Sequence, residues 1–256
     1  MTIAPEDALP SAGLVCVVGA GGKKTTLYTL ADRLERAVVT ATVRIPIFDD
    51  RVARVAVTPD PLDALADGDP SPDADPNTDA DWPLGLVPER EREDRYLGYD
   101  VDAVADVAAA HDGPVLVKAD GARMREFKAP NDREPQVPAA ADAVVPVASA
   151  HAVGEPLTEE RVHRPERVAA LAGLSVGDEL SAETVGRVLA SSEGGLKDVP
   201  PDADAVALVN KVDTDEDEAV AREVAAAALE ADEAGRLDRV VLAALGEKRV
   251  VDVVEG

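Results

Sequence analysis

Residues 19–26 read Gly-Ala-Gly-Gly-Lys-Lys-Thr-Thr, a combination of glycines, lysines and hydroxyls that could hold a phosphate group. An apolar run at 14–18 precedes this turn, and Leu27, Leu30 and Leu34 follow it at helical spacing. Glycines allow backbone N–H groups to converge on one anion, and the first turn of a helix adds partial positive charge. The candidate phosphate-binding residues are Gly19, Gly21, Gly22, Lys23, Lys24, Thr25 and Thr26.

The turn departs from the Walker pattern G-x-x-x-x-G-K-[ST]. If Gly22 and Lys23 form the Gly-Lys pair, the first glycine of the pattern falls at Val17. If Lys24 and Thr25 form the Lys-Thr pair, Lys23 stands in place of the preceding glycine. Either Lys23 or Lys24 could therefore neutralise the phosphates. A plain tight turn between a strand and a helix is the alternative to a phosphate site.

The run Asn210-Lys211-Val212-Asp213 matches the N-K-x-D motif by which GTPases recognise guanine. In that motif the Asp accepts hydrogen bonds from the base, the Asn supports the loop, and the stem of the Lys packs on the base. The run follows an apolar stretch at 205–209, where a buried strand would end. This predicts a guanine site made by Asn210, Lys211 and Asp213. Ordinary turn chemistry ahead of a capped helix is the alternative.

Asp120 follows another short apolar run, at 115–117, where P-loop proteins place a carboxylate that holds Mg²⁺. We therefore expect a metal site formed by Asp120 and the hydroxyl of Thr25, with a metal-free Asp-Gly turn as the alternative. Arg123 and Arg125 follow, and they could stabilise charge on a phosphoryl group or pair with surface carboxylates. The GTPase pattern D-x-x-G would require glycine at position 123, so a γ-phosphate switch of the usual kind is not expected.

These residues require a fold that brings the ends of several strands together. Apolar and β-branched runs predict strands at 14–18, 38–43, 52–58, 115–117, 143–148, 205–209, 239–243 and 249–254. Helical patterns lie at 101–110, 164–172 and 182–189, and another begins after Thr214. The alternation indicates an α/β fold: a mostly parallel sheet with helices on both faces, in a P-loop NTPase-like three-layer architecture. Ligands of such sheets bind at the carboxyl ends of the strands, where the candidate residues lie.

The length of 256 residues suits one P-loop-like nucleotide-binding domain spanning 1–256. Within it, residues 59–81 contain eight Asp and five Pro and no basic residue, which predicts a flexible, solvated insertion with a short helix near 62–66. Cys16 is the only cysteine of the sequence, which excludes an intrachain disulfide and a cysteine zinc cluster.

The charge balance is strongly acidic, with 26 basic residues against 51 acidic ones and a net charge of −25. Such a surface would repel phosphate backbones and anionic lipids, so neither nucleic acid nor a membrane is an expected partner. The sequence contains no apolar stretch long enough to span a bilayer, and a cytoplasmic location is expected. The acidic, lysine-poor composition resembles that of proteins from salt-accumulating halophilic archaea.

Several blocks of sequence carry a wider resemblance, at 19–26, 118–123, 128–130, 134–135, 162–166 and 210–213. Together they resemble the YqeC family, whose members are described as accessory proteins of selenium-dependent molybdenum hydroxylases or as selenium cofactor biosynthesis proteins. Two departures stand out. The family usually reads G-A-G-G-K-T-T, without the second lysine, and it usually has Glu where this chain has Lys118.

The resemblance implies a nucleotide-dependent role in the maturation of a molybdenum hydroxylase. Together with the motifs, it predicts a Mg²⁺-dependent nucleoside triphosphatase that binds GTP or ATP. Lys24 or Lys23 would neutralise the β/γ-phosphates, and Arg123 or Arg125 would stabilise charge in the transition state. The alternatives are a non-hydrolysing module that binds and delivers an anionic nucleotide-type cofactor, and a small-molecule phosphotransferase.

Overall fold

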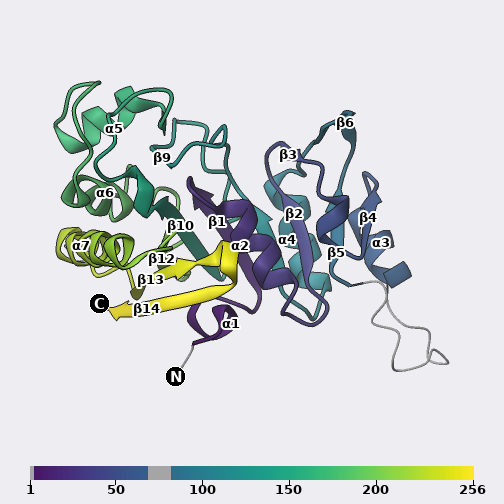
Figure 1. Ribbon diagram of the computed structural model, residues 1–256. Helices are drawn as coiled ribbons and strands as arrows, with labels where there is room; N and C mark the ends of the chain where they lie inside the picture. The colour runs from purple at the N-terminus through teal and green to yellow at the C-terminus, as the bar shows by residue number, and fades with distance from the viewer. Residues whose placement is uncertain (1–2, 69–81) are drawn as a thin grey trace.

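The computed structural model describes residues 3–68 and 82–256. Its centre is a nine-stranded sheet in which all neighbouring strands run parallel except β13 and β14 (Figure 1). In spatial order the strands are β14 (Arg249–Glu255), β13 (Arg239–Ala244), β12 (Asp204–Asn210), β10 (Ala143–Ser149), β1 (Leu14–Gly19), β8 (Val115–Lys118), β2 (Val38–Ala41), β5 (Leu84–Val87) and β4 (Arg54–Val57). The central position therefore belongs to β1, the strand that leads into the glycine turn.

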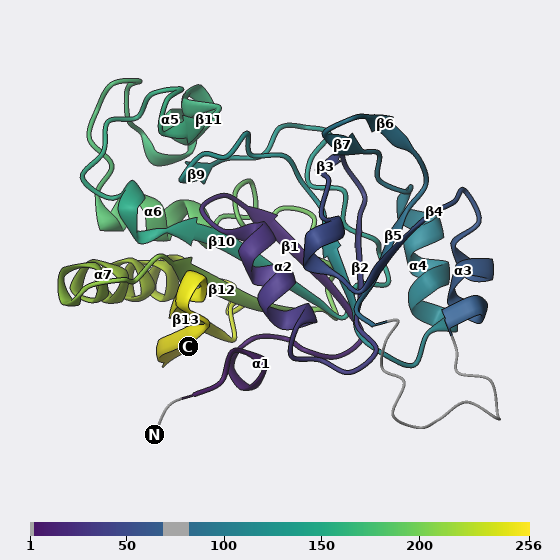
Figure 2. The ribbon, with the colours of Figure 1, turned by 45° about the vertical axis from the view of Figure 1, so that its right-hand side comes forward.

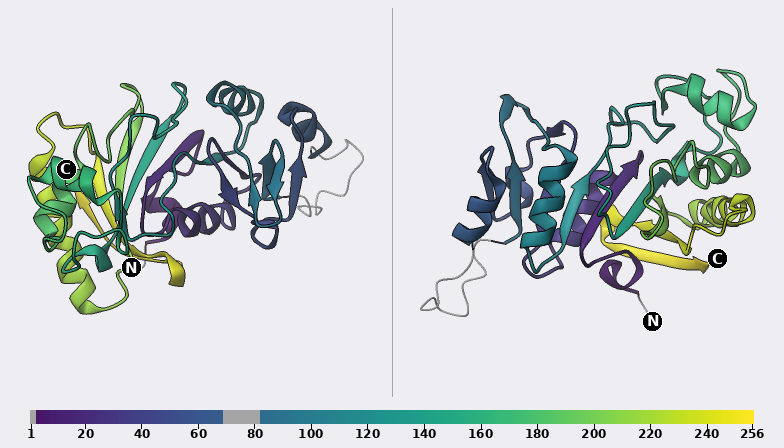
Figure 3. Two further views of the ribbon diagram at one scale, coloured as in Figure 1. Left: turned by 90° about the horizontal axis from the view of Figure 1, so that it is seen from above. Right: turned by 180° about the vertical axis from the view of Figure 1, so that it is seen from behind.

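Helices cover both faces of this sheet. They are α1 (Pro5–Ala8), α2 (Lys23–Ala31), α3 (Pro61–Gly68), α4 (Val101–Ala110), α5 (Pro165–Ala172), α6 (Ala182–Leu189) and α7 (Asp215–Ala231), with 3₁₀ turns η1 (Asp49–Arg51), η2 (Ala150–Ala152) and η3 (Leu245–Glu247). α1 and α2 pack on one face, whereas α3 and α4 pack on the other (Figure 3). α6 and α7 cover the same face as α4, over β10, β12 and β13. The molecule thus has three layers.

Alternate side chains of β1 pack in the hydrophobic cores on opposite faces of the sheet. Leu14, Cys16 and Val18 pack in the core on the α4 side, whereas Val15 and Val17 pack in the core on the α2 side. A parallel strand covered on both faces must be apolar throughout, which is the pattern that made this strand predictable.

The expected α/β class and mostly parallel sheet are confirmed, and the three layers are consistent with a P-loop-like architecture. The short helix expected near 62–66 is confirmed as α3, which spans Pro61–Gly68. Ala64 and Leu65 of this helix are buried in the core that also contains α4, so α3 itself packs on the sheet. Residues 69–81 lie outside the described residues.

A long connection between β8 and β10 crosses the carboxyl ends of the central strands, and we call its residues 121–135 the crossing segment. It contains β9 (Phe127–Lys128), which pairs with β11 (Val162–His163) beyond the end of β1 (Figure 2). A further small sheet is formed by β3 (Ile45–Pro46), β7 (Arg95–Tyr96) and β6 (Arg90–Arg92). Among the helices of the described ranges, none is long and apolar enough to cross a membrane.

Candidate functional site

The glycine turn connects the end of β1 to the start of α2. Gly19, Gly21 and Gly22 have φ angles of 90°, 86° and 153°, in a region that L side chains rarely adopt. A Cβ atom at Gly19 would overlap the carbonyl oxygen of Val147, and one at Gly22 would overlap the side-chain amide of Asn210. These glycines are therefore required by the shape of the turn and by its close packing on β10 and β12.

The first part of the turn uses its N–H groups within the protein. The N–H of Gly19 donates to Asp120 Oδ2 at 2.9 Å, and the N–H of Gly21 donates to the carbonyl oxygen of Arg125 at 3.0 Å. This differs from the expectation that Gly19 and Gly21 would offer their N–H groups to a phosphate. The physical reason is the crossing segment, which lies directly against the turn and supplies the acceptor at residue 125.

The start of α2 offers a smaller anion site. Gly22 is the N-cap residue, and no side chain of the described residues caps it. The first N–H groups of a helix have no acceptor inside the helix, and here they belong to Gly22, Lys23, Lys24 and Thr25. With the helix dipole, they favour an anion at this point. Thr26 is already satisfied, because its buried hydroxyl donates to the carbonyl oxygen of Gly22 at 3.2 Å.

The two lysines of the turn lie in different surroundings. Lys23 is 5% exposed, forms an ion pair with Asp120 Oδ1 at 2.8 Å and donates to the carbonyl oxygen of Gly19. Lys24 lines a surface groove of about 570 Å³ that runs along α2, and Thr25 lines the same groove. The structure therefore brings Lys23, not Lys24, to Asp120.

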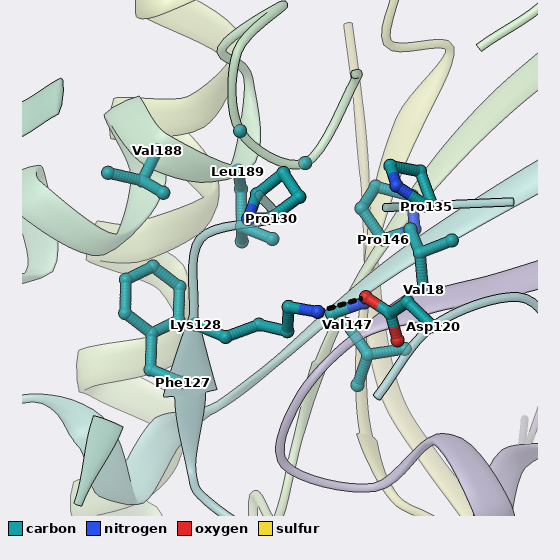
Figure 4. Close-up of a pocket in the computed structure, with 13 residues that line it drawn as sticks. Val18, Asp120, Phe127, Lys128, Pro130, Pro135, Pro146, Val147, Val188 and Leu189 are labelled. Carbon is teal, nitrogen blue, oxygen red and sulfur yellow. Dashed lines mark hydrogen bonds and ion pairs between the residues drawn. The ribbon is translucent and has the colours of Figure 1, made fainter. Parts of the chain in front are cut away.

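Asp120 and Lys128 form the centre of a buried charged cluster at the end of β8. The ammonium of Lys128 lies 2.8 Å from Asp120 Oδ2 (Figure 4). It also lies 3.1 Å from Glu134 Oε2 and donates to the carbonyl oxygen of Gly121 at 2.6 Å. Glu134 in turn pairs with Arg164 at 2.7 Å. The free space beside Asp120 and Lys128 is about 10 Å³, room for one water molecule.

Lys118 adds a third lysine to this cluster. Its Nζ donates to the carbonyl oxygens of Asp120 at 2.7 Å and Arg44 at 2.9 Å. Burial and the neighbouring charge of Lys23 lower the pKa of Lys118 to about 7. A neutral amine has two N–H groups, which these two carbonyl oxygens satisfy.

The carboxylates of the cluster are held in the ionised form. Burial by itself would raise the pKa of Asp120, but the charges of Lys23 and Lys128 outweigh it and lower that pKa to about 2. For Glu134, burial acts in the same upward direction, and the charge of Lys128 with the hydrogen bond from Arg164 lowers its pKa below the usual value. Both carboxylates are therefore ionised at neutral pH and are weak bases, which makes them poorly suited to taking a proton from a substrate.

The expected Mg²⁺ ligands do not form a fitting donor set. Asp120 has a 2% exposed side chain whose two oxygens face the ammonium groups of Lys23 and Lys128. Thr25 lies on the groove beside α2, whereas Asp120 lines the narrow crevice with Lys128. A dication next to two ammonium groups would be repelled, so the residues present do not fit a metal shared by Asp120 and Thr25.

Asn210 joins three parts of the site. Its buried side chain donates to the carbonyl oxygen of Gly21 at 3.1 Å and accepts from the N–H of Leu245 at 3.1 Å. Lys211 has a φ of 62° and pairs with Glu126 of the crossing segment at 2.7 Å. The structure thus places the end of β12 directly against the glycine turn.

Asp213 and the two arginines lie at the surface around this centre. The Asp213 side chain is 45% exposed and lies 3.8 Å from His151 Nε2. Arg123 is exposed, with a φ of 47°, and Arg125 donates its Nε–H to the carbonyl oxygen of Glu159 at 2.6 Å. The structure does not bring either guanidinium into the buried cluster.

Sequence reasoning missed the buried roles of Lys118, Lys128, Glu134 and Arg164. A signal for Lys118 and Lys128 was present, since the segment 118–133 carries five cations against three carboxylates in a chain of net charge −25. Such an excess is consistent with charges that meet in the interior, but spacing along the chain gave no partner for any of them.

Comparisons with known proteins identify the family of this chain. The family model described as "YqeC protein" matches residues 15–166, which amount to more than half of the chain. The matched residues include β1 from Val15 onward, the glycine turn and the crossing segment. An Escherichia coli (strain K12) protein named "Uncharacterized protein YqeC" is 26% identical over 205 residues, or 77% of this chain and 75% of that protein. No solved structure matches. The matched family model shows that this chain belongs to the YqeC family.

Proposed function

We propose that this chain is a nucleotide-binding protein whose ligand phosphates sit at the first turn of α2. The observation that carries the proposal is the uncapped start of α2, which follows a glycine turn and carries two consecutive lysines in a chain of net charge −25. A cationic helix start on so acidic a protein favours a bound polyanion over a solvated surface.

The proposal gives the two lysines separate tasks. Lys24 is half-buried on the open groove, and within residues 3–68 and 82–256 it forms no salt bridge that an arriving phosphate would have to break. Lys23 lies inside the turn, where its charge acts on the phosphate from beneath the N–H groups of α2. The groove of about 570 Å³ beside Lys24 and Thr25 leaves the start of α2 open to an approaching phosphate.

Guanine recognition is proposed for the end of β12. Asp213 presents a half-exposed carboxylate, which can accept from the two N–H groups on the edge of guanine. Asn210 supports this loop from behind through its bonds to Gly21 and Leu245. GTP is therefore the preferred ligand, and ATP is its competitor in the test.

The pathway in which this binding takes part is a further element of the proposal. We place the nucleotide-dependent step in the maturation of a selenium-dependent molybdenum hydroxylase, as the sequence resemblance implies. The acidic surface, which resembles that of halophilic proteins, sets the conditions under which this should be tested.

Non-hydrolysing delivery of an anionic nucleotide-type cofactor is the second candidate. The observation that favours it is the pairing of both Asp120 oxygens with ammonium groups. Burial alone would raise the pKa of Asp120, but these charges outweigh it and lower the pKa to about 2. Such a carboxylate can neither activate water nor take a proton from a substrate hydroxyl.

Titration of fluorescent GTP and ATP into the full-length chain in molar KCl tests binding. Lys24→Ala should weaken both nucleotides by about tenfold, the effect of losing one charge-assisted contact. Asp213→Asn should weaken GTP by a similar factor and leave ATP unchanged. Arg222→Ala on α7 and Asp215→Asn are the matched charge controls. No saturable binding of either nucleotide by the wild-type chain would refute the proposal.

Release of inorganic phosphate separates the two candidates. Steady hydrolysis that Lys24→Ala abolishes would establish a triphosphatase. Tight binding without phosphate release, also in the presence of a partner hydroxylase, would establish the delivery module.

A further inference from the structure

The ammonium of Lys128 lies within 3.1 Å of three oxygen atoms. Its neighbours are Asp120 Oδ2 at 2.8 Å, Glu134 Oε2 at 3.1 Å and the carbonyl oxygen of Gly121 at 2.6 Å. An ammonium has three N–H groups, so the three oxygens satisfy it. The Lys128 side chain is 1% exposed, and its chain reaches the position from β9 (Figure 4).

Carboxylate and carbonyl oxygens in this combination are also the ligands that Mg²⁺ and Ca²⁺ take in proteins. We propose that Lys128 is the resident cation of this site, and that it takes the place which a divalent metal would otherwise occupy at the end of β8. What this proposal implies for phosphate binding rests on the proposed function. The assignment of Lys128 as the cation rests on Lys128 and its three oxygen neighbours alone.

The surrounding charges oppose an additional metal ion. Lys23 faces the other oxygen of Asp120 at 2.8 Å, and Lys118 donates to the backbone of the same residue. With Lys128 and Arg164, the cluster holds four basic groups against the carboxylates of Asp120 and Glu134. A dication would have to displace Lys128 and then lie beside the remaining ammonium groups, at a high electrostatic cost in so buried a place.

The same basic groups suit a polyanion at the neighbouring helix start. Lys23, the first residue of α2, and Lys128 both pair with Asp120, so two lysines meet at one carboxylate beside the glycine turn. Phosphate charge is then balanced by lysines that are already in place, and no protein-bound metal is needed for binding. The affinity for nucleotide should therefore not depend on divalent metal.

Metal binding can be tested without any nucleotide. Mn²⁺ is titrated into full-length wild-type protein and Asp120→Asn in molar KCl and followed by electron paramagnetic resonance, with Asp213→Asn as a surface-carboxylate control. We expect Asp120→Asn to bind Mn²⁺ within about twofold of the wild type and of the control. Loss of a tight Mn²⁺ site in Asp120→Asn alone would overturn the assignment.

A second measurement needs no variant and covers the case in which Asp120→Asn fails to fold. The affinity of the wild-type chain for GTP is compared in excess MgCl₂ and in EDTA. We expect the two dissociation constants to agree within about threefold, and weakening by more than about tenfold in EDTA would overturn the inference. If no nucleotide binds at all, the proposed function fails, whereas the Mn²⁺ titration still decides the role of Lys128.

Discussion

Replacing Asn210 by alanine should destabilise the whole centre of the site. The Asn210 side chain is 3% exposed and makes two hydrogen bonds of 3.1 Å, one to the carbonyl oxygen of Gly21 and one from the N–H of Leu245. Alanine would leave both backbone groups without their partner in a buried place. Each orphaned group costs about 1–2 kcal/mol, so the expected loss in the free energy of unfolding is about 2–4 kcal/mol.

Thermal and urea unfolding in molar KCl measure this loss. For a chain of this length, each kcal/mol lowers Tm by roughly 2–4 °C, so Asn210→Ala should lower Tm by roughly 5–15 °C. Asn210→Asp is the sharper variant. It keeps an oxygen that accepts from Leu245 but turns a second oxygen toward the carbonyl of Gly21, so it should lose about as much stability as alanine does.

Asp213→Asn is the matched control for this experiment. Asp213 belongs to the same motif, but its side chain is 45% exposed, and surface changes of this kind usually alter stability by less than about 0.5 kcal/mol. A loss of less than about 1 kcal/mol for Asn210→Ala would contradict the reasoning, because it would mean that Gly21 and Leu245 find other partners. Equal losses for Asn210→Ala and Asp213→Asn would also contradict it.

Three further outcomes are expected. Burial and the charge of Lys23 lower the pKa of Lys118 from an ordinary value of 10.5 to about 7, so between pH 7 and 10 the unfolded chain binds more protons than the folded one. The free energy of unfolding should therefore rise by ~1 kcal/mol per pH unit over this range. Urea unfolding of Lys118→Met should lack this rise. Calorimetry in increasing KCl should show Tm rising steeply, because salt screens the self-repulsion of a net charge of −25, and a flat response would contradict this. Thr214 and Asp217 form a capping box at the start of α7, so Thr214→Ala should cost about 1–2 kcal/mol in urea unfolding, whereas exposed Asp215→Ala should cost clearly less.

The sheet and the helix starts could be predicted because their signals are local. Continuous apolar runs such as 14–18 and 205–209 are required in parallel strands that are covered on both faces. Helix caps are equally local: Asp100 and Ser181 stand directly before the helical patterns 101–110 and 182–189, and each accepts a hydrogen bond from the N–H three residues later. The antiparallel partner β14 was found for the same reason, since its β-branched residues lie in one short run.

The buried cluster could not be predicted because its contacts join distant segments. Asp120 meets Lys23 across almost a hundred positions, and Glu134 meets Arg164 only because β9 pairs with β11. The crossing segment has no periodicity, so its course over the glycine turn left no mark in the sequence. β5 was missed for a different reason, because its four residues directly follow a proline and are too short to show a pattern.

The geometry of α2 decides which contacts Lys23 and Lys24 each make. Lys23 and Lys24 are the first two residues of α2, and consecutive helical residues point about 100° apart. One side chain must then turn inward when the other faces the groove, so they cannot be alternative candidates for the same contact. The buried side chain is Lys23, whose Nζ pairs with Asp120 Oδ1 at 2.8 Å. Lys24 lies beside Thr25 on the groove. The departure from the family pattern therefore adds a charge at the open side of the turn without replacing the buried one, and Lys24→Ala should weaken nucleotide binding without disturbing the cluster around Asp120.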